Sequence, residues 1–357
     1  MNIRWYGNSH AISQPSSRYP IVATPKVPSI AMPRNKGSIC KKNDCSKIRA
    51  VRAGGEIRVI DERYQKRLQL RPGKKVRLGE YSTGWAHNDA LKEAGKDAVR
   101  ERAMEILEEN WAQLASAQEL LWASNTYAVL IILQGMDTAG KDGTIKHVMS
   151  GVNPQGCKVH SFRVPTEEEL DHTFLWRYWR GLPNRGEIGI FNRSYYEDVL
   201  VVKVHPERLV NLPPGKRGKK FWNARYDDIN AFERHLIRNG TVILKFYLHI
   251  SKDEQKKRLL ERLDDREKLW KFSLSDIEER KFWDRYQEVY EDALTMTSTD
   301  EAPWHIIPAD HKWVARTLVA DIITTKIQSL DLAFPTVSGE AIAQLKEARR
   351  HLEEEEG

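Results

Sequence analysis

Short apolar runs alternate along the chain with longer stretches in which apolar residues recur every three or four positions. The runs are rich in β-branched residues and predict strands at 127–133, 158–162, 187–191, 241–249 and 304–307. The periodic stretches predict helices near residues 92–124, 143–150, 167–180, 224–239, 252–262, 275–297 and 311–327. This alternation is typical of an α/β fold, in which helices cover both faces of a mostly parallel sheet.

The first predicted strand ends in a turn that reads Gly-xxxx-Gly-Lys, with Lys141 as its last residue. The backbone N–H groups of such a turn bind phosphate oxygens, and the lysine adds a mobile cation. Asp142 occupies the place of the usual Ser or Thr, and Asp137 lies inside the loop. Two acids would repel phosphate unless a divalent cation lies between them. The predicted phosphate-binding residues of the turn are Gly135, Ala139, Gly140, Lys141, Asp142 and Gly143.

A second polar motif follows the strand predicted at 187–191. In open parallel sheets, ligands bind beyond the carboxyl ends of the strands, so this motif is expected close to the phosphate loop. Asn192 offers a neutral oxygen to a metal held mainly by Asp137, and the planar head of Arg193 suits phosphate oxygens. A surface salt bridge is the alternative for Arg193. Glu197 and Asp198, one helical turn later, are candidates to orient an acceptor or bind a second metal.

Residues 252–285 carry 11 cations and 10 anions, which also suits a plain solvated helix pair. Three of the cations recur every four residues, however, and so share one helix face. We expect a helical lid that closes over phosphates and excludes water. Its candidate contact residues are Arg258, Arg262, Arg266, Lys268 and Lys271.

The net charge of +7 belongs to the start of the chain, because residues 1–60 alone carry +9 and the remainder carries −2. Five prolines and no apolar periodicity predict a disordered, basic leader there. Residues 61–330 are expected to form the catalytic domain and residues 331–357 a helical or flexible tail. No apolar run is long enough to cross a bilayer. The three cysteines, Cys40, Cys45 and Cys157, form no disulfide framework, which predicts a cytoplasmic protein.

Six segments together resemble the polyphosphate kinase type 2 family, from about residue 60 to about residue 330. They are GMDTAGKDGTIKHVMSGVNPQG, EIGIFNRSYYEDVLVVKVH, RYDDINAFERHL, TVILKFYLHISKDEQKKRL, WKFSLSDIEER and APWHIIPADHKW. The resemblance implies a thymidylate-kinase-like P-loop fold. It also implies reversible transfer of phosphoryl groups between inorganic polyphosphate and nucleotides, with Mg²⁺, or alternatively Mn²⁺, as cofactor.

By the same resemblance, the catalytic residues are Asp137, Lys141 and Arg193. The metal ligands are Asp137 and Asn192, and Asn192 with Glu197 is similar to the class III pattern. This pattern implies AMP and ADP as acceptors and ATP as product, with GMP and GDP as further candidates, and a dimer or tetramer. Polyphosphate would need a lane of cations, for which residues that flank the two motifs are candidates: Lys146, Arg177, Arg180, Lys203 and Arg208.

Two other functions stay open at this point: a nucleoside-monophosphate kinase that uses ATP, and a non-catalytic protein that binds polyanions through its basic leader. A nucleic-acid partner is not expected, because the charge outside the leader is close to neutral. A regulatory GTPase and a dinucleotide enzyme are disfavoured, since neither Asn-Lys-x-Asp nor a Gly-x-Gly-x-x-Gly after a strand occurs.

Overall fold

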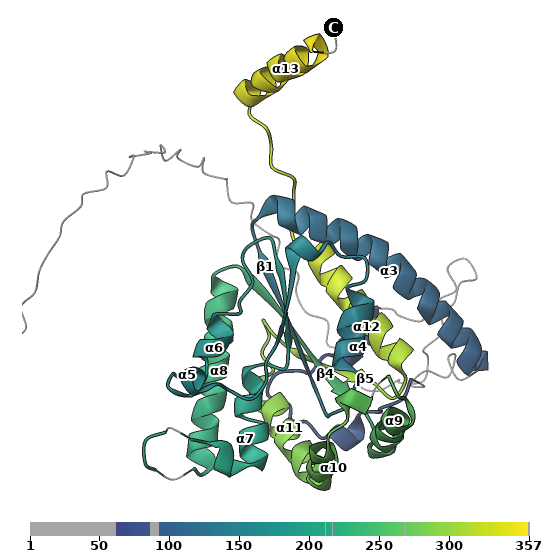
Figure 1. Ribbon diagram of the computed structural model, residues 1–357, viewed down its shortest axis with the longest axis vertical. Coiled ribbons are helices and arrows are strands. Elements are labelled where there is room, and N and C mark those ends of the chain that lie inside the picture. The colour runs from purple at the N-terminus through teal and green to yellow at the C-terminus, as the bar shows by residue number, and fades with distance from the viewer. Residues whose placement is uncertain (1–61, 86–92, 211, 216, 268, 356–357) are drawn as a thin grey trace, which may run out of the picture. The chain divides into compact units, whose positions relative to one another are not determined.

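A five-stranded sheet forms the centre of the structure, a computed structural model that describes residues 62–85, 93–210, 212–215, 217–267 and 269–355 (Figure 1). Its strands are β1 (Ala128–Gly135), β2 (Cys157–Ser161), β3 (Ile188–Asn192), β4 (Thr241–His249) and β5 (Trp304–Pro308). They lie in the order β2-β3-β1-β4-β5, and all neighbours are parallel. The strand order reverses at β1, which is where ligands bind in open α/β sheets.

Helices cover both faces of this sheet (Figure 1). The α-helices are α1 (Glu62–Leu68), α3 (Lys96–Ser124), α4 (Lys141–Val148), α5 (Glu167–Leu170), α6 (Trp176–Trp179), α7 (Val201–Val204), α8 (Lys219–Arg238), α9 (Lys252–Asp264), α10 (Leu274–Lys281), α11 (Trp283–Thr297), α12 (Lys312–Gln328) and α13 (Gly339–Glu354). Short 3-10 turns are η1 (Leu78–Glu80), η2 (Pro154–Gly156), η3 (Tyr195–Asp198), η4 (Pro206–Arg208) and η5 (Leu269–Lys271). Helices α3, α4 and α12 pack together on one face, and α7, α8 and α11 on the other.

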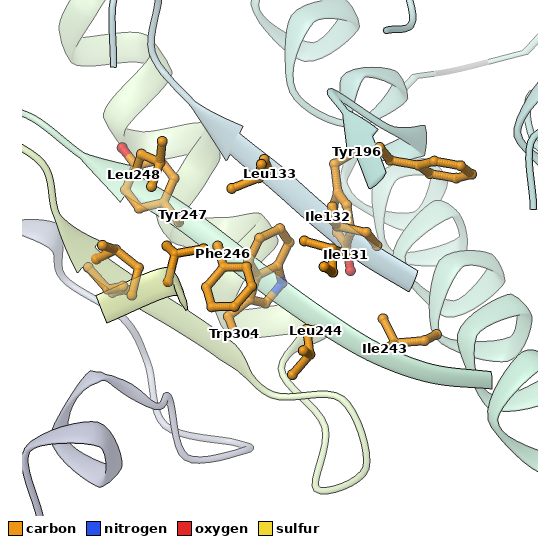
Figure 2. Packing of buried hydrophobic residues seen from close by; sticks show 14 of the residues in the cluster. Ile131, Ile132, Leu133, Tyr196, Ile243, Leu244, Phe246, Tyr247, Leu248 and Trp304 are labelled. Atoms are coloured by element: carbon orange, nitrogen blue, oxygen red, sulfur yellow. The ribbon is translucent and has the colours of Figure 1, made fainter. Parts of the chain in front are cut away.

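The core lies between these layers, and its centre is β1 with β4 (Figure 2). All eight residues of β1 are buried, as the unbroken apolar run predicts for a strand with helices on both faces. Figure 2 shows Ile131, Ile132 and Leu133 of β1 beside Phe246 of β4 and Trp304 of β5. The predicted α/β fold is therefore confirmed, and each predicted strand overlaps an observed one.

Two predicted helices are each broken in the structure. The stretch 167–180 forms two short helices, α5 and α6. Nδ1 of His172 lies 2.7 Å from the carbonyl oxygen of Glu168 and bonds to it, so that this carbonyl does not serve a continuing helix. The stretch 275–297 forms α10 and α11, because the Phe282 amide bonds to the carbonyl of Glu279, three residues back, and tightens the last turn of α10.

Some predictions fall outside the described residues: the leader 1–60, Cys40, Cys45 and Lys268. The predicted tail contains α13, and none of its side chains is buried. Within the described ranges, no helix is both long enough and apolar enough to cross a membrane.

Candidate active site

The phosphate loop runs from the end of β1 to the start of α4. Its first residue, Gly135, has φ 155°, and a Cβ there would lie 2.8 Å from the carbonyl oxygen of Leu248 in β4. Only glycine lets the two strands approach this closely. Thr138 and Gly140 also have positive φ, 65° and 100°, so the loop turns sharply before the helix begins at Lys141.

The ammonium group of Lys141 lies against its own loop. Its Nζ donates to the carbonyl oxygens of Gly135 and Met136, at 2.7 and 3.2 Å. Burial lowers the pKa of Lys141, and the nearby Arg193 lowers it further, while Asp137 opposes both. Negative charge from a phosphate would favour the ammonium form, so the lysine is set up to respond to an anionic ligand.

Arg193 lies directly after β3 and reaches the loop acid. Its Nη2 is 3.2 Å from Oδ1 of Asp137, and both side chains are more than a third exposed. Arg193 has φ 66°, and its amide donates to the carbonyl of Leu133 in β1 at 3.2 Å. An exposed pair of this kind contributes little to stability, so both groups remain available to a ligand. The predicted catalytic residues Asp137, Lys141 and Arg193 are thus brought together.

Asp142 has a contact that the sequence did not reveal. Its Oδ1 accepts a hydrogen bond from Nδ2 of Asn192 at 2.7 Å, and the same amide lies 3.4 Å from Oγ of Ser161. The tip of β3 is therefore fixed to the start of α4. Asn192 bonds to Asp142, so its role as a metal ligand beside Asp137 stays a prediction.

The two acids of η3 differ in their surroundings. Burial raises the pKa of Glu197, and Arg193 and Lys141 partly offset this effect. In the amide orientation that satisfies both of its polar atoms, Gln134 donates to Glu197 at 3.0 Å. Asp198 instead accepts from the hydroxyl of Tyr178 at 3.0 Å and lies 3.8 Å from Arg225. Glu197 therefore belongs to the loop site, while Asp198 is held inside the fold.

Asp198 should make the stability depend on pH. Burial raises its pKa from 3.8 to about 6, although Arg225 lowers it. The folded protein then binds the proton more tightly than the unfolded chain does, and this stabilisation is lost as the pH rises through about 4 to 6. We predict that the difference in melting temperature between wild type and Asp198→Asn decreases from pH 4 to pH 6.5 and is constant above pH 6.5. Calorimetry at constant ionic strength measures both melting temperatures. A difference that does not change with pH would contradict the prediction.

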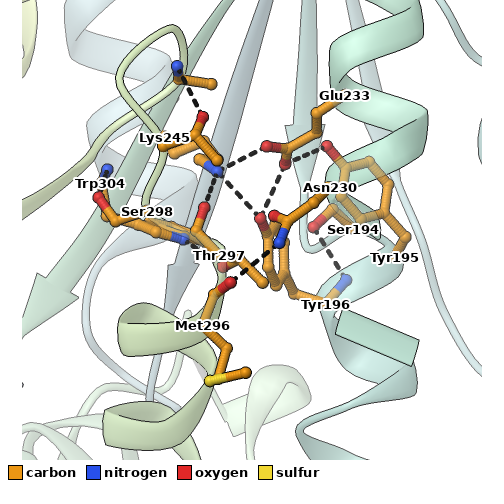
Figure 3. A network of polar contacts seen from close by, with 12 residues as sticks. Ser194, Tyr195, Tyr196, Asn230, Glu233, Lys245, Met296, Thr297, Ser298 and Trp304 are labelled. Carbon is orange, nitrogen blue, oxygen red and sulfur yellow. Dashed lines mark hydrogen bonds and ion pairs between the residues drawn. The ribbon is translucent and has the colours of Figure 1, made fainter. Parts of the chain in front are cut away.

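A polar network under η3 fixes this turn to the sheet (Figure 3). Lys245 of β4 is fully buried and donates to Glu233 of α8 and to the carbonyl of Thr297, each at 2.6 Å. Glu233 also accepts from the hydroxyls of Tyr195 and Tyr196 in η3, at 2.8 and 2.7 Å. The backbone that carries Glu197 therefore rests on a buried ion pair.

A cavity of about 640 Å³ opens over the phosphate loop. Its cations come from the loop, from the ends of β2 and β3, and from helices α9 and α12; they are Lys141, Arg163, Arg193, Arg258, Arg262, Lys312 and Arg316. The lining acids are Asp137, Asp142, Glu261 and Asp276. Positive charge in a partly enclosed space concentrates anionic ligands, and phosphates are the anions that this loop suits.

Sequence reasoning missed three of these cations, Arg163, Lys312 and Arg316. Arg163 follows β2 by two residues, and the other two lie four residues apart in the first turns of α12, just after β5. The rule that placed Arg193 at the site, proximity to the carboxyl end of a strand, could have found them all.

The predicted polyphosphate lane does not match the lining of this cavity. Arg177 is buried and donates to the carbonyl of Arg163, and Lys203 is bound to Asp292 at 2.6 Å. Neither lines the cavity, so their role in binding polyphosphate stays a prediction. Arg208 pairs with Glu279, and Arg180 lies over the ring of Trp176. Like Lys146, these two are absent from the lining given for the cavity, so their role stays a prediction.

The residues of the predicted lid differ in their surroundings, and the lid itself stays a prediction. Arg258 is only 4 % exposed and binds the phosphate loop from behind, so it is not a cation that arrives with a closing lid. Helix α9 ends at Asp264, which places Arg266 in a turn and not on the helix face. Arg262 does line the cavity and lies 3.7 Å from Asp276 of α10. Lys271 lies in η5.

The oxygen donors of the cavity suit Mg²⁺. Asp137 of the phosphate loop and Asp142 in the first turn of α4 provide carboxylates, and Mg²⁺ typically takes one or two carboxylates together with water and substrate phosphates. Within the described part of the chain there is no group of three His, Cys, Asp or Glu that would form a closed metal cage. A metal shared with bound phosphates fits this arrangement.

Comparison with known proteins settles the family. The model of the family described as Polyphosphate kinase 2 (PPK2) matches residues 94–334. The chain belongs to the polyphosphate kinase 2 family. Its fold is accordingly a P-loop kinase fold, as predicted, and the cavity over the loop is the active-site candidate of a phosphotransferase.

Curated relatives and a solved structure agree with this membership. The chain is 47 % identical over 290 residues to an ADP-polyphosphate phosphotransferase of Rhodopseudomonas palustris, covering 80 % of this chain and 98 % of the relative. It is 50 % identical over 243 residues to an AMP/ADP-polyphosphate phosphotransferase of Meiothermus ruber, covering 68 % and 86 %. The crystal structure of Polyphosphate Kinase 2 from Arthrobacter aurescens TC1 superimposes with a TM-score of 0.65 at 40 % identity, covering 70 % and 87 %. These matches support the family and the class of enzyme, a kinase that acts on polyphosphate.

Proposed function

We propose that this protein transfers phosphoryl groups between inorganic polyphosphate and AMP or ADP, in either direction. The observation that carries the proposal is the cavity over the phosphate loop, where Asp137, Lys141 and Arg193 meet among further cations. A phosphate chain has many charges and no base, so it needs such a surface more than a shaped pocket. The relatives named for AMP and ADP support these acceptors.

Lys141 and Arg193 are the groups placed to stabilise charge on the transferring phosphoryl group. Phosphoryl transfer depends mainly on positioning and on charge stabilisation. Mg²⁺, or alternatively Mn²⁺, held by Asp137 would offset the repulsion between donor and acceptor phosphates. The negative charge of Glu197 raises the pKa of Arg193 and so favours its charged form. Asn192, Glu197 and Asp198 remain our candidates for acceptor specificity, which includes GMP and GDP as alternatives.

One assay separates this function from an ATP-dependent nucleoside-monophosphate kinase. The full chain is given AMP, polyphosphate and Mg²⁺ without any nucleoside triphosphate, and nucleotides are separated by anion-exchange chromatography. We expect ADP first and ATP afterwards, with neither formed when polyphosphate is omitted. Product that appears only when ATP is supplied would favour the rival.

The leader provides a second test. If the protein only bound polyanions through its basic leader, removing residues 1–60 would abolish polyphosphate binding. We expect turnover to persist without the leader, because the proposed site lies within residues 137–316. A cytoplasmic location and a dimer or tetramer remain predictions.

A further inference from the structure

A phosphate loop binds its ligand through backbone N–H groups, so its carbonyl groups face away from the ligand and must find donors elsewhere. Buried carbonyls that lack a donor cost free energy, and loops of this kind leave few partners within their own backbone. Three successive carbonyls, those of Asp137, Thr138 and Ala139, are bound by side chains of one helix, α9.

Two side chains of α9 supply these donors. Nε2 of Gln255 donates to the carbonyl of Asp137 at 3.1 Å. Nη1 of Arg258 donates to the carbonyls of Thr138 and Ala139, at 2.9 and 3.2 Å. Gln255 and Arg258 are 2 % and 4 % exposed, so water does not compete for these bonds.

All donors of Arg258 are used by the protein. Nη2 donates to the carbonyls of Ala309 and Asp310 at the end of β5, at 2.6 and 3.0 Å, and Nε donates to Glu254 at 2.7 Å. With the two loop bonds, these five contacts match the five N–H groups of a guanidinium. Arg258 lines the cavity but has no donor left for a phosphate. Its bonds join the phosphate loop to the segment that follows β5.

Gln255 is oriented from its other end. Its Oε1 accepts from Nη1 of Arg280 in α10 at 2.7 Å, and the same Arg280 atom donates to the carbonyl of Lys252 at 2.8 Å. Because the oxygen of the amide faces Arg280, its nitrogen faces the loop. The carbonyl of the predicted metal-binding acid, Asp137, is therefore held by a side chain that cannot turn freely.

The loop needs this support because its backbone is strained. Thr138 has φ 65°, a conformation that is unfavourable for a residue with a Cβ and persists only where surrounding contacts enforce it. Of the two loop carbonyls that Arg258 binds, that of Thr138 is the closer. Without that bond, the peptide would relax and turn N–H groups away from the phosphates.

We propose that Arg258 and Gln255 are positioning residues for phosphoryl transfer: they bind the outward carbonyls of residues 137–139 and so keep the loop N–H groups and Asp137 aimed at the substrate. Neither side chain acts on the phosphates. The inference rests on the proposed function, and the experiment below separates the two.

The test compares Arg258→Met, Arg258→Lys and Gln255→Met with Lys257→Met. Lys257 is the matched control, because it directly precedes Arg258 on α9 but its side chain is 67 % exposed and pairs with Glu254 and Glu261. For each protein, kcat and KM for AMP and polyphosphate are measured, together with the melting temperature. Hydrogen exchange of peptides covering the phosphate loop and β4 is followed without substrate.

We expect a kcat about 100-fold lower for Arg258→Met and about tenfold lower for Gln255→Met, since small misplacements of a catalytic loop have effects of this size. Arg258→Lys should recover part of the loss because it keeps a donor, and Lys257→Met should behave as wild type. Loop amides should exchange at least tenfold faster in both Met variants while β4 is unchanged. Faster exchange in β4 as well would indicate a merely structural role and overturn the proposal.

The proposal would also be overturned if Gln255→Met kept kcat within threefold of wild type or left the exchange of the loop amides unchanged. This variant removes only the bonds of Gln255 to the Asp137 carbonyl and to Arg280, so it decides the matter if Arg258→Met fails to fold. If wild type itself shows no turnover with polyphosphate, the proposed function fails, and the exchange data alone still decide whether α9 holds the loop.

Discussion

Replacing Lys245 by Met is expected to lower the free energy of unfolding by about 3–5 kcal/mol, because it leaves the carboxylate of Glu233 buried without a compensating charge. Glu233 is 1 % exposed, and its remaining partners are the hydroxyls of Tyr195 and Tyr196. Burial already lowers the pKa of Lys245, which shows that the surroundings disfavour an isolated charge. Chemical denaturation at pH 7 measures the change.

The double variant Lys245→Met with Glu233→Gln is the informative control. It removes both charges, so most of the lost stability should return even though the three hydrogen bonds of Lys245 are lost. A single variant that unfolds within 1 kcal/mol of wild type, or a double variant that is no better than the single one, would contradict the assignment. Because the network carries η3, the single variant should also weaken catalysis through Glu197 and Arg193.

The second large effect is expected at Asp137. Changing it to Asn should lower kcat by about a thousandfold or more, which corresponds to about 4 kcal/mol of barrier. Asn keeps the shape but loses the charge that would hold Mg²⁺ between donor and acceptor phosphates. Polyphosphate binding should survive, since the amide no longer repels the chain. Steady-state kinetics and calorimetric titration with tripolyphosphate measure the two effects.

Asp253→Asn is the matched control for this change. Asp253 is an exposed acid in the first turn of α9, so its replacement alters net charge equally and should leave kcat unchanged. An Asp137→Asn enzyme with activity within about tenfold of wild type, about 1.4 kcal/mol of barrier, would remove Asp137 from the mechanism.

The sheet and the heart of the site could be predicted because their signals are local. The apolar run of β1 ends in a glycine-rich turn, and Arg193 follows its strand directly, so short stretches of sequence indicate both structure and chemistry. Fold class, strands and the meeting of Asp137, Lys141 and Arg193 followed from such stretches together with the rule on strand ends.

What could not be predicted depends on packing between distant segments. Arg177 and Lys203 are near the motifs in sequence, yet each head is bound inside the fold, while Lys312 and Arg316 reach the cavity from α12. The periodicity of α9 indicates which residues share a face but not what covers that face. It therefore predicts Arg258 as a lid residue and does not reveal its bonds to the phosphate loop. The breaks after α5 and α10 depend on single hydrogen bonds that propensity does not reveal.

The ammonium group of Lys141 already has two oxygen partners, the carbonyls of Gly135 and Met136. An arriving phosphate therefore exchanges with existing bonds and does not meet a bare cation, so the lysine adds only the difference to affinity. That difference grows in the transition state, as negative charge accumulates on the oxygens of the phosphoryl group that is being transferred. When the phosphate leaves, the same two carbonyls take up the ammonium group again, so its departure leaves no bare cation.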